Sequence, residues 1–192
     1  MPLATAVQPA VTSAPPANGD EVLYEIIDGR WVELPPMSFF AARIASRLVG
    51  WLIAFSRTKA LGEAVMETLF HLPLPLDRNR RPDVAFVSLQ RLRQAGTQPK
   101  DDNAWNVVPN LAVEVVSPNE LAEDLLEKIE EYFQAGVQMV WVVYPRRQII
   151  QVYESLTHIR GLTRTDELDG GTVLPGFRLP LATLFEEQPV SA

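Results

Sequence analysis

Two carboxylates and one lysine of this 192-residue chain stand where the surrounding pattern is apolar. Asp83 lies in the run Arg81-Pro82-Asp83-Val84-Ala85-Phe86-Val87, and Glu114 lies in Leu111-Ala112-Val113-Glu114-Val115-Val116. Lys128 lies on the predicted helix that follows the second run. Acidic side chains are among the least often buried without a partner, so a strand that carries one amid Val, Ala and Phe bears an energetic cost. A bound cation would offset that cost.

These residue types suit the hydrolysis of phosphodiesters. Mg²⁺ takes oxygen ligands and keeps several waters, so Asp83 and Glu114 on neighbouring strands could hold it together with a substrate phosphate. The cation would polarise a phosphoryl oxygen and lower the pKa of a bound water, while a nearby ammonium group positions the nucleophile. The helical spacing allows Lys128 to reach across the sheet toward Glu114, which completes this interpretation.

Each of the three residues also has a purely structural interpretation. Lys128 could form an i,i+4 pair with Asp124, worth only a few tenths of a kcal/mol. Asp83 could pair with Arg81 at a strand edge, and Glu114 could belong to a buried ion pair. The residues alone leave both interpretations open.

Other candidate ligands are weaker. Glu67, inside Met66-Glu67-Thr68, is a possible third acid, although a solvent-facing strand position is the simpler interpretation. His71 and His158 lack the spacing of metal ligands and are predicted to be structural. With no cysteine in the chain, disulfides and thiolate sites are excluded, which favours a hard cation held by oxygen.

Composition narrows the class of protein. The chain is 47% hydrophobic and 21% charged, which is typical of one globular domain. Its formal charge of −7 argues against coating nucleic acid by bulk attraction. Positive charge nevertheless clusters around Asp83, either as part of a site or as a solvated loop; it comes from Arg78, Arg80, Arg81, Arg91 and Arg93. No uninterrupted apolar run is long enough to span a bilayer and no signal peptide is recognisable, so we expect no membrane partner and a cytoplasmic location.

The predicted elements form a mixed α/β domain. We expect a disordered tail over residues 1–19, a domain over 20–186 and a C-terminal tail over 187–192. Asp28-Gly29 suits the type I′ turn of a hairpin over 22–34, and Ser38 can cap a helix that runs to about Arg57. A second helix is predicted from a Ser117 cap to Gly136, with its leucines, Leu121 and Leu126 among them, on the buried half and its glutamates, Glu131 among them, on the exposed half. Strands are predicted over 64–72, 82–88, 111–116, 139–143 and 148–153, and a loop over 94–103.

Four motifs carry a family resemblance. They are Tyr24-Glu25-Ile26-Ile27-Asp28-Gly29, Arg81-Pro82-Asp83-Val84, the run from Pro109 to Pro118 around Glu114, and the segment from Asp124 to Trp141 that includes Lys128. In order and spacing the chain resembles, over roughly residues 20 to 186, the Uma-type restriction endonuclease family of the PD-(D/E)xK nuclease superfamily. The resemblance implies a restriction-endonuclease-like fold: a mixed sheet flanked by helices, with an N-terminal β-hairpin.

The resemblance also implies site residues and partners. Asp83, Glu114 and Lys128 are expected to be catalytic, and Asp83, Glu114 and Val115 are expected to hold Mg²⁺, for which Mn²⁺ may substitute. DNA would be the substrate and a homodimer the assembly. The usual lysine of the superfamily falls two residues after the second acid, where this chain has Val116; the resemblance implies that Lys128 has taken its place. The acidic charge and the Val116 departure keep a second hypothesis open, a catalytically inactive nuclease-fold module that binds DNA or protein.

Overall fold

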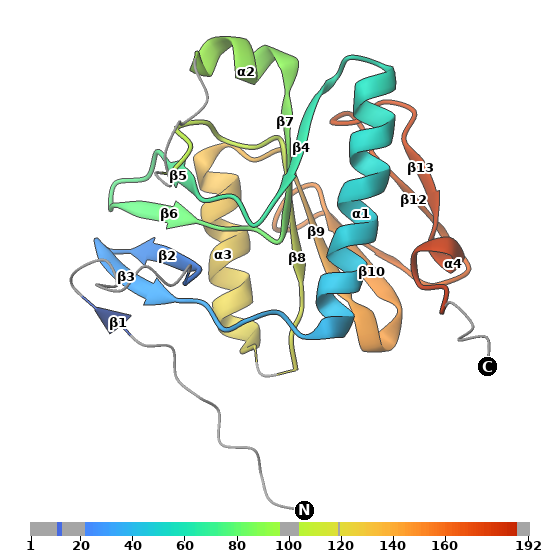
Figure 1. Cartoon of the computed structure of the whole chain (residues 1–192), viewed down its shortest axis with the longest axis horizontal. Coiled ribbons are helices and arrows are strands. Elements are labelled where there is room, and N and C mark those ends of the chain that lie inside the picture. The colour runs from blue at the N-terminus through green and yellow to red at the C-terminus, as the bar shows by residue number, and fades with distance from the viewer. Residues whose placement is uncertain (1–10, 13–21, 97–103, 119, 188–192) are drawn as a thin grey trace, which may run out of the picture.

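A six-stranded mixed sheet lies between two layers of apolar side chains, with α1 on one face and α3 on the other (Figure 1). The computed structural model describes residues 11–12, 22–96, 104–118 and 120–187. The strand order is β11-β10-β9-β8-β7-β4. These strands are β4 Gly62–Met66, β7 Val84–Ser88, β8 Leu111–Val115, β9 Met139–Tyr144, β10 Ile149–Tyr153 and β11 Ile159–Leu162. The predicted mixed α/β class, with its sheet flanked by helices, is confirmed.

A second sheet contains the predicted N-terminal hairpin. Its order is β1-β3-β2-β6-β5, formed by β1 Val11–Thr12, β2 Tyr24–Ile27, β3 Arg30–Glu33, β5 Phe70–Leu72 and β6 Arg78–Arg80. Asp28 and Gly29 have φ angles of 53° and 70°, the positive values that a type I′ turn requires. Strand β1, which pairs with β3, falls inside the segment predicted to be disordered. The rest of residues 1–19 lies outside the described residues.

Helix α1, Phe39–Thr58, is the main core helix. Ser38 caps it as predicted, because its hydroxyl accepts a hydrogen bond from the amide of Ala41 at 3.2 Å. Ile44, Leu48 and Leu52 are fully buried against the sheet. By length and composition alone α1 is also long and apolar enough to cross a membrane, a test that the core helix of a globular domain passes as well.

Helix α3, Ala122–Ala135, connects the parallel strands β8 and β9. It ends at Gly136 in the predicted left-handed conformation, but it begins four residues later than expected. The predicted Ser117 cap is wrong, because residues before α3 form a turn in which the amide of Glu120 donates to the carbonyl of Ser117. The predicted faces also need correction: Leu121 and Leu126 are exposed, whereas Glu131 is buried.

One strand prediction and one loop prediction were also wrong. The predicted strand over 64–72 is divided at Glu67, whose φ of 47° turns the chain from β4 into the second sheet. The predicted loop over 94–103 begins inside an unpredicted helix, α2 Leu89–Ala95, capped by the hydroxyl of Ser88; residues 97–103 lie outside the described residues. The chain ends in a ribbon of β12 Glu167–Asp169 and β13 Arg178–Pro180, followed by the short helix α4 Leu181–Leu184.

Candidate active site

The pairing of β7 with β8 places the two predicted acids opposite each other. The strands are antiparallel, with Val84 beside Val113. Extending this register by one residue sets Asp83 beside Glu114, and both side chains then face the α3 side of the sheet because side chains alternate along a strand. The sheet therefore brings together two acids that are 31 positions apart in the sequence.

Asp83 is tied to β8 through its carboxylate. Its Oδ2 accepts a hydrogen bond from the amide of Val115 at 2.5 Å. Burial, reinforced by the negative charge of Glu114, holds the pKa of Asp83 well above its ordinary value, although the Val115 amide and Lys128 oppose the shift. Within the described part of the chain, Oδ1 of Asp83 accepts no hydrogen bond. One oxygen of Asp83 is therefore fixed by the backbone, and the other is available to a ligand.

Glu114 is almost completely buried, with 3% of its surface exposed. Its Oε1 accepts a hydrogen bond from the hydroxyl of Tyr132 at 2.6 Å, and its Oε2 lies 3.6 Å from the Nζ atom of Lys128. Burial raises the pKa of Glu114 to about 7 and the charge of Glu25 adds to the effect, whereas Lys128 and Tyr132 oppose it. At neutral pH this carboxyl group is therefore partly protonated.

Lys128 lies at this site rather than on the exposed surface of α3. In the described part of the chain its ion pairs are with Glu114 and with Glu120, whose Oε1 is 3.7 Å from Nζ, and not with Asp124. Burial lowers the pKa of Lys128, but the carboxylates of Glu114, Glu25 and Glu120 outweigh that effect and hold it above its ordinary value. The amine is therefore charged throughout the physiological range, and the surface pair with Asp124 is not formed.

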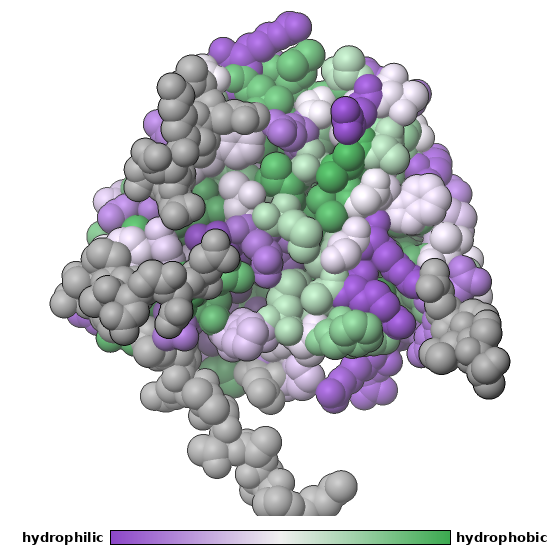
Figure 2. Space-filling model, in the orientation of Figure 1, coloured by the Kyte–Doolittle hydropathy of each residue, from purple (hydrophilic) through white to green (hydrophobic). Residues whose placement is uncertain are grey.

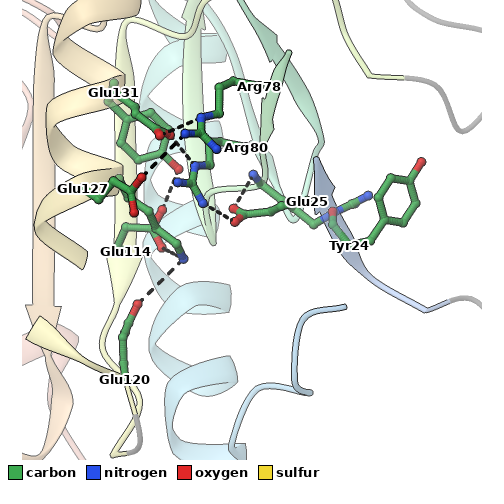
Figure 3. Close-up of polar contacts among 11 residues, drawn as sticks. Tyr24, Glu25, Arg78, Arg80, Glu114, Glu120, Glu127 and Glu131 are labelled. Carbon is green, nitrogen blue, oxygen red and sulfur yellow. Dashed lines mark hydrogen bonds and ion pairs between the residues drawn. The ribbon is translucent and has the colours of Figure 1, made fainter. Parts of the chain in front are cut away.

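A second buried group of charges joins the hairpin sheet to α3 (Figure 3). The guanidinium of Arg80 lies 2.8 Å from Glu25 on β2 and 2.6 Å from Glu131 on α3. Arg78 contacts the other oxygen of Glu131 at 2.8 Å. Two of the clustered arginines are thus buried ion-pair partners, so their interpretation as part of a solvated loop is wrong.

Glu25 is the site residue that sequence reasoning missed. It is 1% exposed, and its Oε1 also accepts a hydrogen bond from the amide of Arg81. Arg81 precedes Asp83 by two residues. The charges of Lys128 and Arg80 and the Arg81 amide overcome burial and hold the pKa of Glu25 below its ordinary value. The available signal was an acid flanked by Tyr24 and Ile26 in a strand, the same signal that singled out Glu114.

The remaining predicted ligands contribute differently. The side chain of Val115 has no atom that can coordinate a metal, so only its backbone carbonyl could bind a cation. Glu67 is held by its backbone, since its amide donates to the carbonyl of Asp83 and its carbonyl accepts from the guanidinium of Arg81. Among the described residues, no three His, Cys, Asp or Glu side chains are grouped so that they could hold a metal ion. Any cation here would therefore rest on two carboxylates. The predicted structural roles suit the histidines: His71 contacts Asn79 at 2.9 Å, and His158 is an exposed partner of Glu154.

Comparisons with known proteins agree with this arrangement. The model of the Uma2 family, described as a putative restriction endonuclease family, matches residues 12–182. The chain belongs to the Uma2 family. Its fold is also similar to the crystal structure of a putative nuclease belonging to DUF820 from Anabaena variabilis, with a TM-score of 0.72 and 17% sequence identity over 84% of this chain and 89% of that one. No curated protein matches the chain. This Uma2 protein therefore shares the fold of that DUF820 protein, and the predicted family is confirmed.

Proposed function

We propose that this Uma2 protein is an Mg²⁺-dependent endonuclease that hydrolyses phosphodiester bonds in DNA. The observation that carries the proposal is the convergence of Asp83, Glu114 and Lys128 at the end of β8. Asp83 directly precedes β7, Glu114 lies on β8 and Lys128 lies on α3. Two acids that face each other, both with pKa values raised by burial, are a costly arrangement in a protein that uses them only for packing.

The donor set fits a hard divalent cation. Asp83 offers Oδ1, Glu114 offers the remaining lone pairs of its carboxylate, and Val115 offers a backbone carbonyl. Two carboxylates suffice for Mg²⁺, which keeps waters and accepts substrate oxygens as further ligands. When bound, the cation supplies the polarisation of the phosphoryl group and the acidity of a water molecule.

Lys128 would act as a fixed positive charge. Because its pKa lies above the ordinary value, it holds its proton at neutral pH and cannot serve as a general base. It lies close enough to Glu114 to orient that carboxylate, and its charge can stabilise negative charge that develops on the phosphoryl oxygens. The hydroxyl of Tyr132 fixes the other oxygen of Glu114 from the same helix.

One observation favours the second hypothesis, a nuclease fold that binds without cleaving. Glu114 already has Tyr132 and Lys128 as partners, so its own carboxylate is satisfied without a cation. If this second hypothesis holds, divalent metals would neither change the stability of the protein nor lead to cleavage of DNA.

A cleavage assay separates the two functions. Purified protein is incubated with supercoiled and linear DNA in EDTA, Mg²⁺ or Mn²⁺, beside the variants Asp83→Asn and Glu114→Gln. An endonuclease converts supercoiled DNA to nicked or linear forms only with metal, and neither variant does so. Glu130→Gln is the matched control, because Glu130 is an exposed acid on α3. Absence of cleavage by the wild-type protein with either metal, together with unchanged melting, would contradict the proposal.

We further propose that the protein acts in the cytoplasm as a homodimer. Cleavage of both strands of a duplex needs two sites, and a two-fold dimer supplies them from one repeated interface.

A further inference from the structure

A groove lies beyond the ends of β8 and β9, beside the candidate active site. It has a volume of about 710 Å³, which lies within the range of small-molecule and nucleotide pockets. It is lined by Ser38, Phe39, Phe40, Ala41, Val116, Ser117, Pro118, Tyr144, Pro145, Arg146, Arg147, Gln148 and Glu187. Val116 follows Glu114 by two residues and packs in the same layer on the α3 side, so the groove and the site adjoin along one strand.

The groove is positively charged in a protein that is negative overall. Arg146 and Arg147 are exposed on the 3₁₀ turn η1, Pro145–Arg147, and neither forms an ion pair within the described part of the chain. Arg43 lies one turn into α1, and its guanidinium is 4.8 Å from the ring centre of Phe40, which lines the groove. Arg43 therefore adds a positive charge next to the groove. Glu187 is the acidic side chain among the lining residues. In a chain whose net charge of −7 disfavours contact with nucleic acid, two arginines without an ion pair at this groove suit a phosphate backbone.

The groove is also lined by an exposed aromatic ring, that of Phe39. Phe39 is 82% exposed at the start of α1, where an apolar side chain gains nothing from the core. The first turn of α1 also lacks acidic residues that would repel a phosphate. In Figure 2 hydrophobic and hydrophilic surface lie side by side at this lower end of α1. Proteins that bind single strands combine these two features, since aromatic rings stack on bases while basic residues follow the backbone.

We infer that this groove binds an unpaired nucleotide of the DNA strand that continues to Asp83 and Glu114, with Arg146 and Arg147 on its phosphate and Phe39 against its base. The inference rests on the proposed function in taking DNA as the substrate. It adds a preference for a strand whose bases are unstacked, and it assigns that preference to residues outside the candidate active site.

Binding without cleavage tests the groove separately from catalysis. Fluorescence anisotropy of a labelled oligonucleotide, single-stranded or duplex, is measured in EDTA over a range of salt concentrations with the full chain. Removing both arginine contacts to this phosphate in R146Q/R147Q should weaken single-strand binding at least about tenfold and reduce the salt slope by about 0.7. Phe39→Ser should weaken single-strand binding about tenfold and leave duplex binding unchanged. Glu187→Gln should strengthen binding.

The matched control removes two charges at the other end of α1. Arg57, in its last turn, and Arg93, on α2, are exposed arginines of that end, and R57Q/R93Q should bind as the wild type does. Thermal melts confirm that each variant is folded. Equal weakening by both double variants, no effect of Phe39→Ser, or no binding by the wild type would each overturn the inference. Glu114→Gln should still bind DNA in EDTA, because the groove lies outside the candidate active site. If the wild type binds DNA through the groove but does not cleave it with either metal, the proposed function is refuted and the inference about the groove still holds.

Discussion

Replacing Glu114 by glutamine should stabilise the metal-free protein at alkaline pH. Burial raises the pKa of Glu114 from 4.5 to about 7, so the folded protein holds a proton that the unfolded chain has released. The folded state then binds more protons than the unfolded state, and stability falls as pH rises from about 4.5 to about 7. A shift of this size corresponds to about 3 kcal/mol above pH 7. Glutamine resembles the protonated form and does not titrate.

The expected gain in unfolding free energy for Glu114→Gln is therefore up to about 3 kcal/mol at about pH 8, and it should vanish at about pH 4, where the wild-type carboxyl is protonated. Urea denaturation in EDTA at both pH values measures it, with Glu130→Gln as the exposed control. Asp83→Asn should shift stability in the same direction, because burial and the charge of Glu114 raise the pKa of Asp83 as well. Its amide oxygen can still accept from Val115.

Adding Mn²⁺ completes the test. The wild type should gain about 2.7 kcal/mol at a metal concentration one hundred times its Kd, and the two amide variants should gain nothing. The reasoning would be refuted if either variant lost about 3 kcal/mol or more without metal while responding to Mn²⁺ as the wild type does. That result would mean that the acids are structural ion-pair partners, since breaking a buried pair leaves an uncompensated charge.

Three further predictions concern the neighbouring charges and the assembly. Lys128→Met keeps the packing of the side-chain stem and removes its charge, so it should abolish cleavage. It should also lower stability at about pH 8, where ionised Glu114 loses its ion pair, and change stability little at about pH 4. Retained cleavage would remove Lys128 from the mechanism. Arg80→Met should cost about 3–5 kcal/mol in urea denaturation, because Glu25 and Glu131 lose a buried partner, and a neutral effect would show that this network adds no stability. Light scattering at micromolar concentration should give twice the mass of one 21.4 kDa chain, and a monomer mass would contradict the homodimer.

Local signals in the sequence determined the elements that carry the site. The hairpin turn at Asp28-Gly29, the Ser38 cap and the left-handed Gly136 depend on the backbone preferences of a few adjacent residues, so they could be predicted. The isolated acids in apolar runs pointed to Asp83 and Glu114, and the order of the motifs pointed to the family. Tertiary packing overrode local preference at the start of α3: the Glu120 carboxylate accepts the Ser117 amide as in a capping box and also pairs with Lys128, yet the helix begins only at Ala122.

Only the tertiary structure decided which charges meet. The Arg80 contacts join residues 55 and 51 positions apart, and no local pattern encodes such a distance. Glu131 looked like an exposed helix residue because its neighbours are acidic, yet the arginines of β6 cover it and make it buried. The helical spacing alone left Lys128 with two possible partners, Asp124 and Glu114. The packing of α3 beside the end of β8 selected Glu114, since burial strengthens a charge pair that water would otherwise screen.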